Sequence, residues 1–452
     1  MNESQTMECD VLVIGSGAGG LSAAVAAAVR RLDVLLIEKE PFLGGTTAQS
    51  GGWLWVPCSP HARRAGIDDT AEKARTYLKH ETGSRYDGAR SDVFLAAGPE
   101  MIDFFERKTA VKFFLGADYP DYHPDAPGAL PGGRAVCALQ FDGRALGENL
   151  RLVRQPPRQL TLFGIKVGSG PDDGHFANAQ RSLRSTLYVA KRILVHCAQV
   201  VLYGRDVILM SGNALVGRLV KSALDRGVRL KVSTAATGLI LKDGRVVGVT
   251  AAAVTGAITI IARRGVVCAA GGFSHDLARR RRLYPQCAET DEYYSLACTG
   301  NTGDGLRIAE AVGAAVDESG ASPAAWMPVS GVPCADGSLA PYLRSGYLKR
   351  GRTLDEIAAQ TGMNARTLND TVKRFNANAK EGRDTEFGRG ANVYNVYQGD
   401  PANRPSACVA PLEKPPFYAV QIYPGDLSTF AGLMTDDCAR VLSVIPPVEL
   451  KS

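Results

Sequence analysis

The sequence lacks the cysteine patterns of a metal centre or of a disulfide-stabilised domain. Its ten cysteines and six histidines are scattered along 452 residues, and no Cys-x-x-Cys pair occurs. Such usage is typical of reduced thiols in an intracellular protein. The sequence therefore predicts a cytoplasmic location and no metal site.

No stretch combines the length and the apolar character of a membrane-spanning helix. The best candidate, Val11 to Val29, carries no charge but contains four glycines near its centre. The residues before it include Glu3, Glu8 and Asp10 and no lysine or arginine, which is the wrong flank for a signal peptide. We therefore expect no stable membrane span.

A strong excess of one charge sign is also absent. Lysine and arginine number 52 against 46 aspartates and glutamates, which leaves a net charge of +6. This mild balance does not by itself imply a nucleic-acid partner. Apolar residues make up 45% and charged residues 22%, as in ordinary globular proteins, and the length suffices for two or three domains.

The first forty residues carry the pattern of a dinucleotide-binding βαβ unit. Cys9 to Ile14 is a short apolar run that predicts a buried parallel strand, and Leu21 to Arg30 is alanine-rich and helical. Between them, Gly15, Gly17 and Gly20 have the spacing Gly-x-Gly-x-x-Gly. These glycines allow, in turn, a tight turn, the approach of a pyrophosphate and the packing of helix on strand.

An acidic residue closes the second predicted strand. Val34 to Ile37 is apolar and is followed by Glu38, whose carboxylate suits a contact to the ribose hydroxyls of the nucleotide. Gly44-Gly45-Thr46-Thr47 and Ser50-Gly51-Gly52 then form a second backbone-exposing loop. Two such loops suit a ligand that continues beyond the pyrophosphate, and this favours FAD over NAD.

With this second loop the chain resembles the fumarate reductase/3-ketosteroid dehydrogenase family of flavoproteins. Members carry the same Gly-Gly-Thr-x-x-x-Ser-Gly-Gly arrangement, and the resemblance implies that it lines the flavin ring. A helix over Asn213 to Gly227 with an asparagine cap, a strand over Val228 to Val232 and a β-meander with glycine turns at Gly244 and Gly256 fit the rest of the family's nucleotide domain.

The resemblance also implies a set of cofactor-binding residues. Ala235 and Ala236 would border the adenine, the Gly271-Gly272 turn would return the chain under the cofactor, and Asp304 would face the ribityl chain, although it suits a helix cap equally well. The full set assigned to FAD is Gly15, Gly17, Ala18, Gly19, Gly20, Glu38, Lys39, Gly45, Thr46, Thr47, Ser50, Gly51, Gly52, Ala235, Ala236, Gly271, Gly272 and Asp304.

The predicted fold class is α/β: a Rossmann-like FAD-binding domain with a β-meander, plus an inserted α+β substrate cap domain. The resemblance places the FAD-binding domain at residues 1–274 and 417–452 and the cap domain at 275–416. Tyr122, in Tyr119-Pro120-Asp121-Tyr122, matches the family's active-site tyrosine, although such a residue is more often half-buried packing. Met327 stands where fumarate reductases would place a histidine, which favours a small apolar, steroid-like ketone over a dicarboxylate.

Three segments allow other interpretations. Thr353 to Phe375 has the pattern of a helix-turn-helix, but its acidic residues oppose phosphate, and we expect plain packing helices and no nucleic-acid partner. The run Arg279 to Arg282 reads as a solvated helix face, and Met434 to Cys438 as an exposed acidic turn.

The resemblance implies an FAD-dependent oxidoreductase acting on CH–CH bonds, and most specifically a 3-ketosteroid 1-dehydrogenase-like desaturase. The family's Asn-Glu and tyrosine stretch after Ser338 and its final Tyr-Pro-Gly-x-Gly turn have no match, as in an internally deleted, C-terminally truncated member, so we expect impaired turnover. Another desaturase or enoate reductase of the family and a non-catalytic nucleotide-binding remnant stay open, and the electron acceptor is unknown.

Overall fold

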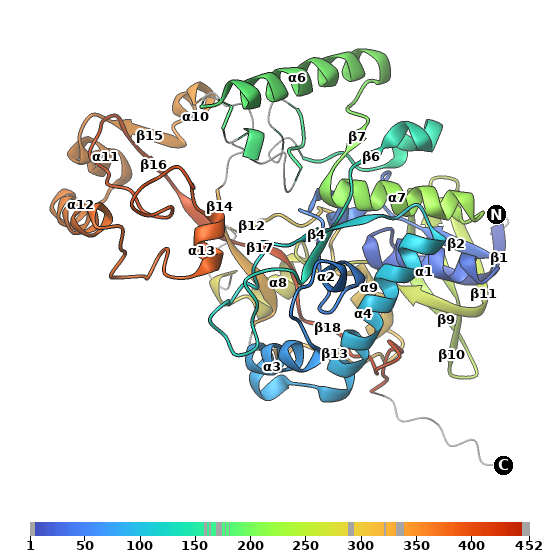
Figure 1. The fold of residues 1–452 in the computed structure, drawn as a ribbon. Helices are drawn as coiled ribbons and strands as arrows, with labels where there is room; N and C mark the ends of the chain where they lie inside the picture. Colours follow the sequence, from blue (N-terminus) through green and yellow to red (C-terminus); the bar gives the residue numbers. More distant parts are fainter. Residues whose placement is uncertain are drawn as a thin grey trace.

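The computed structural model describes residues 5–157, 161, 164–168, 174–176, 178–179, 181–287, 293–320, 322–330 and 339–444. The larger body is built around a six-stranded sheet. A smaller lobe of helices α10 to α13 stands beside this body, and helix α6 lies along one edge, apart from the sheet (Figure 1). No helix in the described part of the chain is long and apolar enough to cross a membrane.

The central sheet has the strand order β8-β2-β1-β11-β10-β9. Its strands are β1 (Gln5–Ile14), β2 (Val34–Ile37), β8 (Arg229–Lys231), β9 (Thr234–Lys242), β10 (Arg245–Ala253) and β11 (Gly256–Cys268). β8, β2, β1 and β11 run parallel, and β10 and β9 join β11 as antiparallel hairpins. The predicted βαβ unit and β-meander are therefore confirmed, and they form one sheet.

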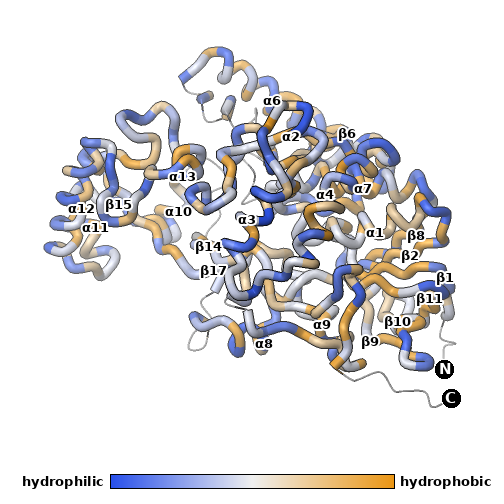
Figure 2. The backbone as a smooth tube through the Cα atoms, turned by 60° about the horizontal axis from the view of Figure 1, so that its bottom comes forward, coloured by the Kyte–Doolittle hydropathy of each residue, from blue (hydrophilic) through white to orange (hydrophobic). Residues whose placement is uncertain are grey.

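Both faces of the sheet are covered at β2 and at the end of β1. Successive side chains of a strand point to opposite sides, so neighbouring residues there enter two different cores. Val13 and Leu36 join a core that includes α1 (Ala18–Val29) and α7 (Ser211–Asp225). Leu12 and Leu35, one residue away, pack in a second core with the meander strands. Figure 2 shows the resulting concentration of hydrophobic residues on the central strands.

Helix α7 begins two residues earlier than the sequence predicts. Its N-cap is Met210, so the predicted asparagine cap is wrong. Asn213 lies buried in the first turn, where its Nδ2 donates to the Arg154 carbonyl at 2.7 Å. The side-chain amide of Asn213 thus serves a contact to a distant segment, and a local sequence pattern does not reveal such a contact. Gly227 follows the helix with φ +74°, as a closing glycine should.

The remaining elements position the loops around the sheet. The other helices are α2 (Pro60–Arg64), α3 (Ala71–Thr82), α4 (Gly88–Lys108), α6 (Leu183–Tyr203), α8 (Leu277–Leu283) and α9 (Asp304–Glu310), with 3-10 helices η1 (Gly45–Gln49), η2 (Gly83–Arg85), η3 (Gly143–Leu152) and η5 (Pro285–Cys287). The smaller sheets comprise β3 (Trp53–Trp55), β4 (Phe113–Gly116) and β5 (Ala135–Ala138); β6 (Phe141–Asp142) and β7 (Ile208–Leu209); β12 (Tyr294–Ser295), β14 (Ala324–Ser330) and β17 (Ile422–Thr429); and β13 (Val316–Asp317) and β18 (Gly432–Leu433).

The lobe is a compact insertion between β14 and β17. It contains α10 (Ala340–Arg344), β15 (Leu348–Gly351), α11 (Leu354–Thr361), α12 (Ala365–Lys380), α13 (Val393–Gln398) and β16 (Phe417–Val420). β14 and β17 are antiparallel neighbours, so the chain leaves and re-enters the body side by side. The predicted domain limits remain a prediction.

Helices α11 and α12 form the helix-turn-helix segment noted in the sequence. Ile357 and Ala358 of α11 and Val372 of α12 are buried in the lobe. Asn369, a residue type that could read bases, donates instead to the Asp355 carboxylate at 2.6 Å. These contacts give the segment a packing role, and the absence of a nucleic-acid partner stays a prediction.

The arginine run of α8 is not a uniformly solvated face. Arg280 is buried, with its guanidinium 4.2 Å from the centre of the Tyr293 ring. Arg279 and Arg282 pair with the Glu318 carboxylate. The prediction of a solvated face is therefore wrong for Arg280, because a cation can be buried when an aromatic face receives it.

Candidate functional site

The glycine turn between β1 and α1 leaves one side of the backbone open. Gly15 has φ +99°, and a Cβ there would lie 2.2 Å from the Ala269 carbonyl oxygen. A Cβ on Gly20 would lie 2.0 Å from the Gly15 carbonyl oxygen. At Gly17, in contrast, the nearest heavy atom to such a Cβ is the Thr47 hydroxyl at 3.6 Å. Gly15 and Gly20 thus serve the packing, while Gly17 faces a space that fits a pyrophosphate.

Glu38 follows β2 directly and points back to this turn. Its carboxylate is almost fully buried and accepts hydrogen bonds from the Ser16 backbone N–H at 3.0 Å and the Ser16 hydroxyl at 2.6 Å. The Glu40 N–H donates to the other carboxylate oxygen at 3.0 Å. These three donors fix the carboxylate at the edge of the cavity, as a ribose anchor requires.

The second glycine loop is tied to two distant parts of the site. The Thr47 hydroxyl accepts from the Ala18 N–H at 3.0 Å, at the start of α1. The Thr46 hydroxyl accepts from the Cys298 N–H at 3.0 Å and from the Asn301 side-chain amide at 3.2 Å. The loop therefore bridges the glycine turn and the segment that leads into α9.

Two residues of the cavity lining form an ion pair. Lys39 Nζ lies 2.5 Å from an Asp304 carboxylate oxygen and 2.6 Å from the Thr302 hydroxyl. Burial opposes ionisation of Asp304, but the hydrogen bond and charge of Lys39 outweigh it, so the pKa of the carboxyl is lowered. Asp304 is the first residue of α9 and not its cap, because Gly303 occupies the N-cap position.

One cavity collects most of the predicted cofactor residues. Thirteen of them line it: Gly15, Gly17, Ala18, Gly19, Glu38, Lys39, Gly45, Thr46, Thr47, Ala236, Gly271, Gly272 and Asp304. Its lining also includes residues that were not predicted, among them Ser16, Thr234, Cys298, Gly300 and Ser428. The open glycine backbone and the fixed carboxylate fit the ADP half of FAD.

Five predicted residues lie outside this lining: Gly20, Ser50, Gly51, Gly52 and Ala235. Gly20 packs against the turn, and Ser50 Oγ donates to the Thr47 carbonyl at 2.8 Å and accepts from the Gly52 N–H at 3.1 Å. These contacts fix the conformation of the glycine turn and of the second loop, although the residues that make them do not line the cavity. Their contact with FAD itself stays a prediction.

An aromatic pocket begins where the second loop ends. Strand β3 supplies Trp53 and Trp55, and the other lining residues are Tyr77, Leu78, Tyr119, Pro120, Asp121, Tyr122 and Ala135. The Tyr119 ring lies 4.6 Å from Trp53, and Tyr122, which is 63% exposed, lies 5.3 Å from Tyr394 of the lobe. Both ring contacts favour the tilted or edge-on geometries that aromatic pairs prefer. The pocket is therefore a mainly apolar slot whose open side holds Tyr122.

The two tyrosines of this pocket have different environments. Burial, together with the hydrogen bond to Tyr122, raises the pKa of Tyr119 well above its usual value. Tyr119 thus stays protonated and serves as a hydrogen-bond donor. Asp121 between them is occupied elsewhere, because its carboxylate accepts from Trp55 Nε1 at 2.7 Å and from Arg134 at 2.8 Å.

A buried lysine supports the second loop, and nothing in the sequence pattern singled it out. Lys166 Nζ donates to the Ser50 carbonyl at 2.9 Å and the Ala48 carbonyl at 3.3 Å. Burial lowers the pKa of this ammonium to about 8. Lys166 therefore holds the loop through backbone acceptors at an electrostatic cost.

This cost predicts a pH dependence of stability. Below pH 8 the ammonium is charged in the folded and the unfolded chain, so the burial penalty is fully present; above the unfolded pKa of 10.5 it is gone. The unfolding free energy of the parent protein, relative to Lys166→Met, should rise by roughly 3 kcal/mol between these limits. Urea unfolding across this range measures the difference. The exposed Lys414→Met should show a constant difference, and a flat profile for Lys166→Met would contradict the assignment.

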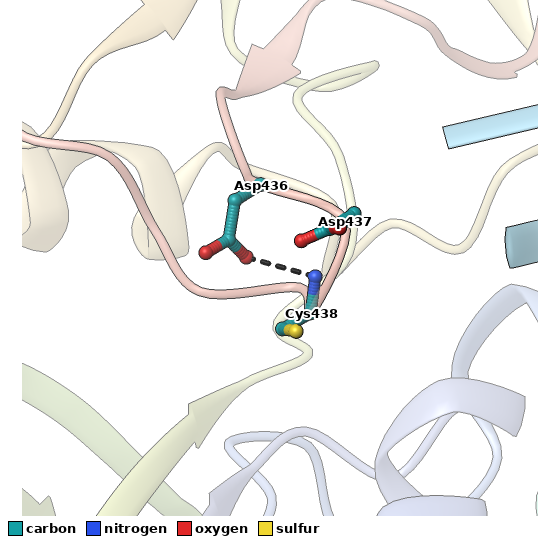
Figure 3. A group of neighbouring side chains, drawn as sticks. All are labelled: Asp436, Asp437 and Cys438. Atoms are coloured by element: carbon teal, nitrogen blue, oxygen red, sulfur yellow. Dashed lines mark hydrogen bonds between the residues drawn. The ribbon is translucent and has the colours of Figure 1, made fainter. Parts of the chain in front are cut away.

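The acidic turn near the end of the described chain brings Asp436, Asp437 and Cys438 together (Figure 3). Their possible metal-binding atoms lie within 4.8 Å of one another. The Asp436 carboxylate, however, accepts from the Cys438 N–H at 3.0 Å and from the Arg440 backbone and side chain at 2.8 and 2.6 Å. The arrangement is that of an exposed turn, as the sequence predicts.

Comparisons with known proteins agree with this geometry. The family model described as "FAD binding domain" matches residues 10–356 and 343–446. The 4-oxocyclohex-2-ene-1-carboxylate 5-dehydrogenase of Sinomonas cyclohexanicum is 35% identical over 96% of this chain and 86% of that protein. The 3-oxosteroid 1-dehydrogenase of Mycobacterium tuberculosis strain H37Rv is 31% identical over 96% of this chain and 90% of that protein.

A solved structure matches the fold closely. The 3-ketosteroid Δ1-dehydrogenase of Sterolibacterium denitrificans, in complex with 1,4-androstadiene-3,17-dione, has a TM-score of 0.85 and 29% identity over 97% of this chain and 91% of that chain. The predicted family and cofactor are thereby confirmed. The chain belongs to the FAD binding domain family, and it is an FAD-dependent oxidoreductase of the 3-ketosteroid dehydrogenase/fumarate reductase group.

Proposed function

We propose that the enzyme introduces a carbon–carbon double bond next to the carbonyl of an apolar cyclic ketone of the 3-ketosteroid kind. The observation that carries the proposal is the aromatic pocket of Trp53, Trp55, Tyr77, Tyr119 and Tyr122. Such flat, rigid side chains suit a flat, fused-ring substrate. The relatives support the reaction type, since 3-oxosteroid 1-dehydrogenases are among them.

Tyr122 is proposed as the group that takes the proton from the carbon beside the carbonyl. It lies on the open side of the pocket, and the Tyr119 hydroxyl shares a hydrogen bond with it. This hydrogen bond gives the Tyr122 oxygen, the atom proposed to accept the proton, a neighbouring donor in the pocket. Bound FAD would supply the hydride acceptor for the neighbouring carbon, so that one C–H bond would be lost as a proton to Tyr122 and the other as a hydride to the cofactor.

A second candidate substrate is a cyclohexanone that carries a carboxylate. Identity favours it, since the 35% identical relative is named for 4-oxocyclohex-2-ene-1-carboxylate. The pocket chemistry favours the apolar ketone, because no lysine, arginine or histidine is among the residues that line the aromatic pocket in the described structure. Its one charged lining residue, Asp121, is paired with the buried Arg134, which also pairs with Asp69, so this cluster offers no cation to a substrate carboxylate.

Anaerobic mixing of the FAD-loaded enzyme with candidate substrates tests the proposal. We expect 4-androstene-3,17-dione to bleach the flavin absorbance and to gain a second conjugated double bond, while 4-oxocyclohexanecarboxylate and fumarate react at least about tenfold more weakly, a gap of roughly 1.4 kcal/mol. Preference for the carboxylate would move the assignment to the second candidate. An unchanged flavin spectrum with all cyclic ketones would refute both.

Impaired turnover, expected from the sequence, stays a prediction. The alignment with the 35% identical relative spans 517 positions, more than the 452 residues of this chain, so part of that relative has no counterpart here. A lost stretch that shields the reacting atoms from water would slow the reaction. Comparison of kcat with that of such a relative measures the deficit.

A further inference from the structure

Helix α6 carries its apolar residues on the outside. Leu183, Leu187, Leu194 and Val201 are between 63% and 85% exposed. Their intervals of four, seven and seven residues keep them on one line along the helix. Ser185 is the one buried residue of the helix, and Figure 1 shows α6 at the edge of the molecule, apart from the sheet.

The opposite side of α6 makes polar contacts to the rest of the protein. The Val207 N–H donates to the Gln199 side chain at 3.1 Å, and His196 Nδ1 lies 3.3 Å from an Asp206 carboxylate oxygen. Near the start of the helix, His175 Nδ1 lies 3.2 Å from the Ser185 hydroxyl. A helix that packs on a protein core has the reverse arrangement, with its apolar side inward. The outward line of α6 is therefore suited to an external apolar partner.

The charge of α6 decides between the possible partners. Its sequence from Leu183 to Tyr203 contains no aspartate or glutamate. Arg184 and Lys191, seven residues apart, lie along one edge of the apolar line and are exposed. Two copies of this helix packed together would bring basic edges close without an acidic partner, which disfavours a self-associated pair. A basic edge beside a leucine line instead complements an anionic lipid surface.

We propose that α6 is an interfacial helix that docks the enzyme on an anionic lipid bilayer. The leucine line enters the boundary between headgroups and acyl chains, and Arg184 and Lys191 lie at the level of the lipid phosphates. This inference is independent of the proposed substrate. Docking would also bring the enzyme to the bilayer in which the proposed apolar ketone substrate concentrates.

Flotation of the FAD-loaded full chain with vesicles tests the proposal. The protein should float with phosphatidylcholine vesicles that contain phosphatidylglycerol and much less with pure phosphatidylcholine. Leu187→Gln combined with Leu194→Gln should weaken the partitioning by more than roughly tenfold, since each loses buried apolar surface. Arg184→Gln and Lys191→Gln should each weaken it about fivefold on the anionic vesicles.

The control is Val254→Gln, which removes an exposed apolar side chain from the turn between β10 and β11 and should leave flotation unchanged. Flavin absorbance and the melting temperature confirm that each variant is folded. Absence of flotation of the parent protein overturns the proposal. So does a leucine variant that still floats but changes the mass measured by light scattering, because the line would then be an interface between two copies of the chain.

Discussion

Replacing Tyr122 by phenylalanine is expected to slow substrate-dependent reduction of the bound flavin on the order of 100- to 10,000-fold, the usual contribution of a general base. The substitution removes the hydroxyl and keeps the ring, so the edge-on contact with Tyr394 at 5.3 Å is retained. Affinity for FAD should stay the same, because Tyr122 is not among the residues that line the cofactor cavity. The flavin absorbance, followed anaerobically during a single turnover, measures the rate of flavin reduction directly.

The matched control for this experiment is Tyr394→Phe. Tyr394 touches Tyr122 through its ring, and its hydroxyl lies 3.3 Å from the Gln398 side-chain amide. Loss of that hydroxyl should change the rate of reduction less than about threefold. If Tyr122→Phe also stayed within threefold of the parent, the proton would have to go to another group.

Replacing Gly17 by valine is expected to lower the affinity for FAD on the order of 100-fold, or about 2.7 kcal/mol, without unfolding the protein. The backbone of Gly17 has φ −66° and ψ −177°, which an L-residue adopts without strain. A Cβ there has the Thr47 hydroxyl, at 3.6 Å, as its one neighbour within 4 Å, so the valine side chain would project into the space that fits the pyrophosphate. Overpacking of this kind costs roughly 1–3 kcal/mol, and displaced hydrogen bonds add to it.

Gly20→Val is expected to lower the stability of the fold, in contrast to Gly17→Val, which is expected to lower the affinity for FAD. A Cβ at Gly20 would overlap the Gly15 carbonyl at 2.0 Å, so this variant should lose the packing of α1 on β1 and melt at a much lower temperature. Titration with FAD and thermal unfolding of both variants separate the two roles. Parental affinity in a folded Gly17→Val variant would show that the pyrophosphate lies elsewhere.

The sheet and the glycine turn could be predicted because their signals are local. Alternating or continuous apolar runs, turn glycines at fixed spacing and the terminal Glu38 each appear within a few residues of the element they specify. The same holds for the β-meander, whose two hairpins have glycines at Gly244 and Gly256. The apolar runs, the turn glycines and the terminal acid all predict the same elements, and this agreement allows the structure of such a segment to be predicted from its sequence.

The residues that were missed depend on contacts between distant segments. Cys298 and Ser428 line the cofactor cavity because β12 and β14 pair with β17. The sequence around either residue contains no signal of this pairing. Lys166 reaches the carbonyls of Ala48 and Ser50 from more than a hundred residues away. Arg280 is buried because an aromatic ring from another segment covers it. A pattern that contains only neighbours cannot specify such pairs.

The order of the strands along the chain has a consequence for biosynthesis. All six strands of the central sheet lie before residue 269, so the sheet can close before any residue of the lobe has left the ribosome. At 5–20 residues per second, the 184 residues from 269 to 452 take about 9–37 s to synthesise. During that interval the glycine turn, Glu38 and the second loop are already in place to capture the ADP half of FAD. The cofactor can thus act as a ligand of the nascent chain that stabilises the body while the lobe is still being made.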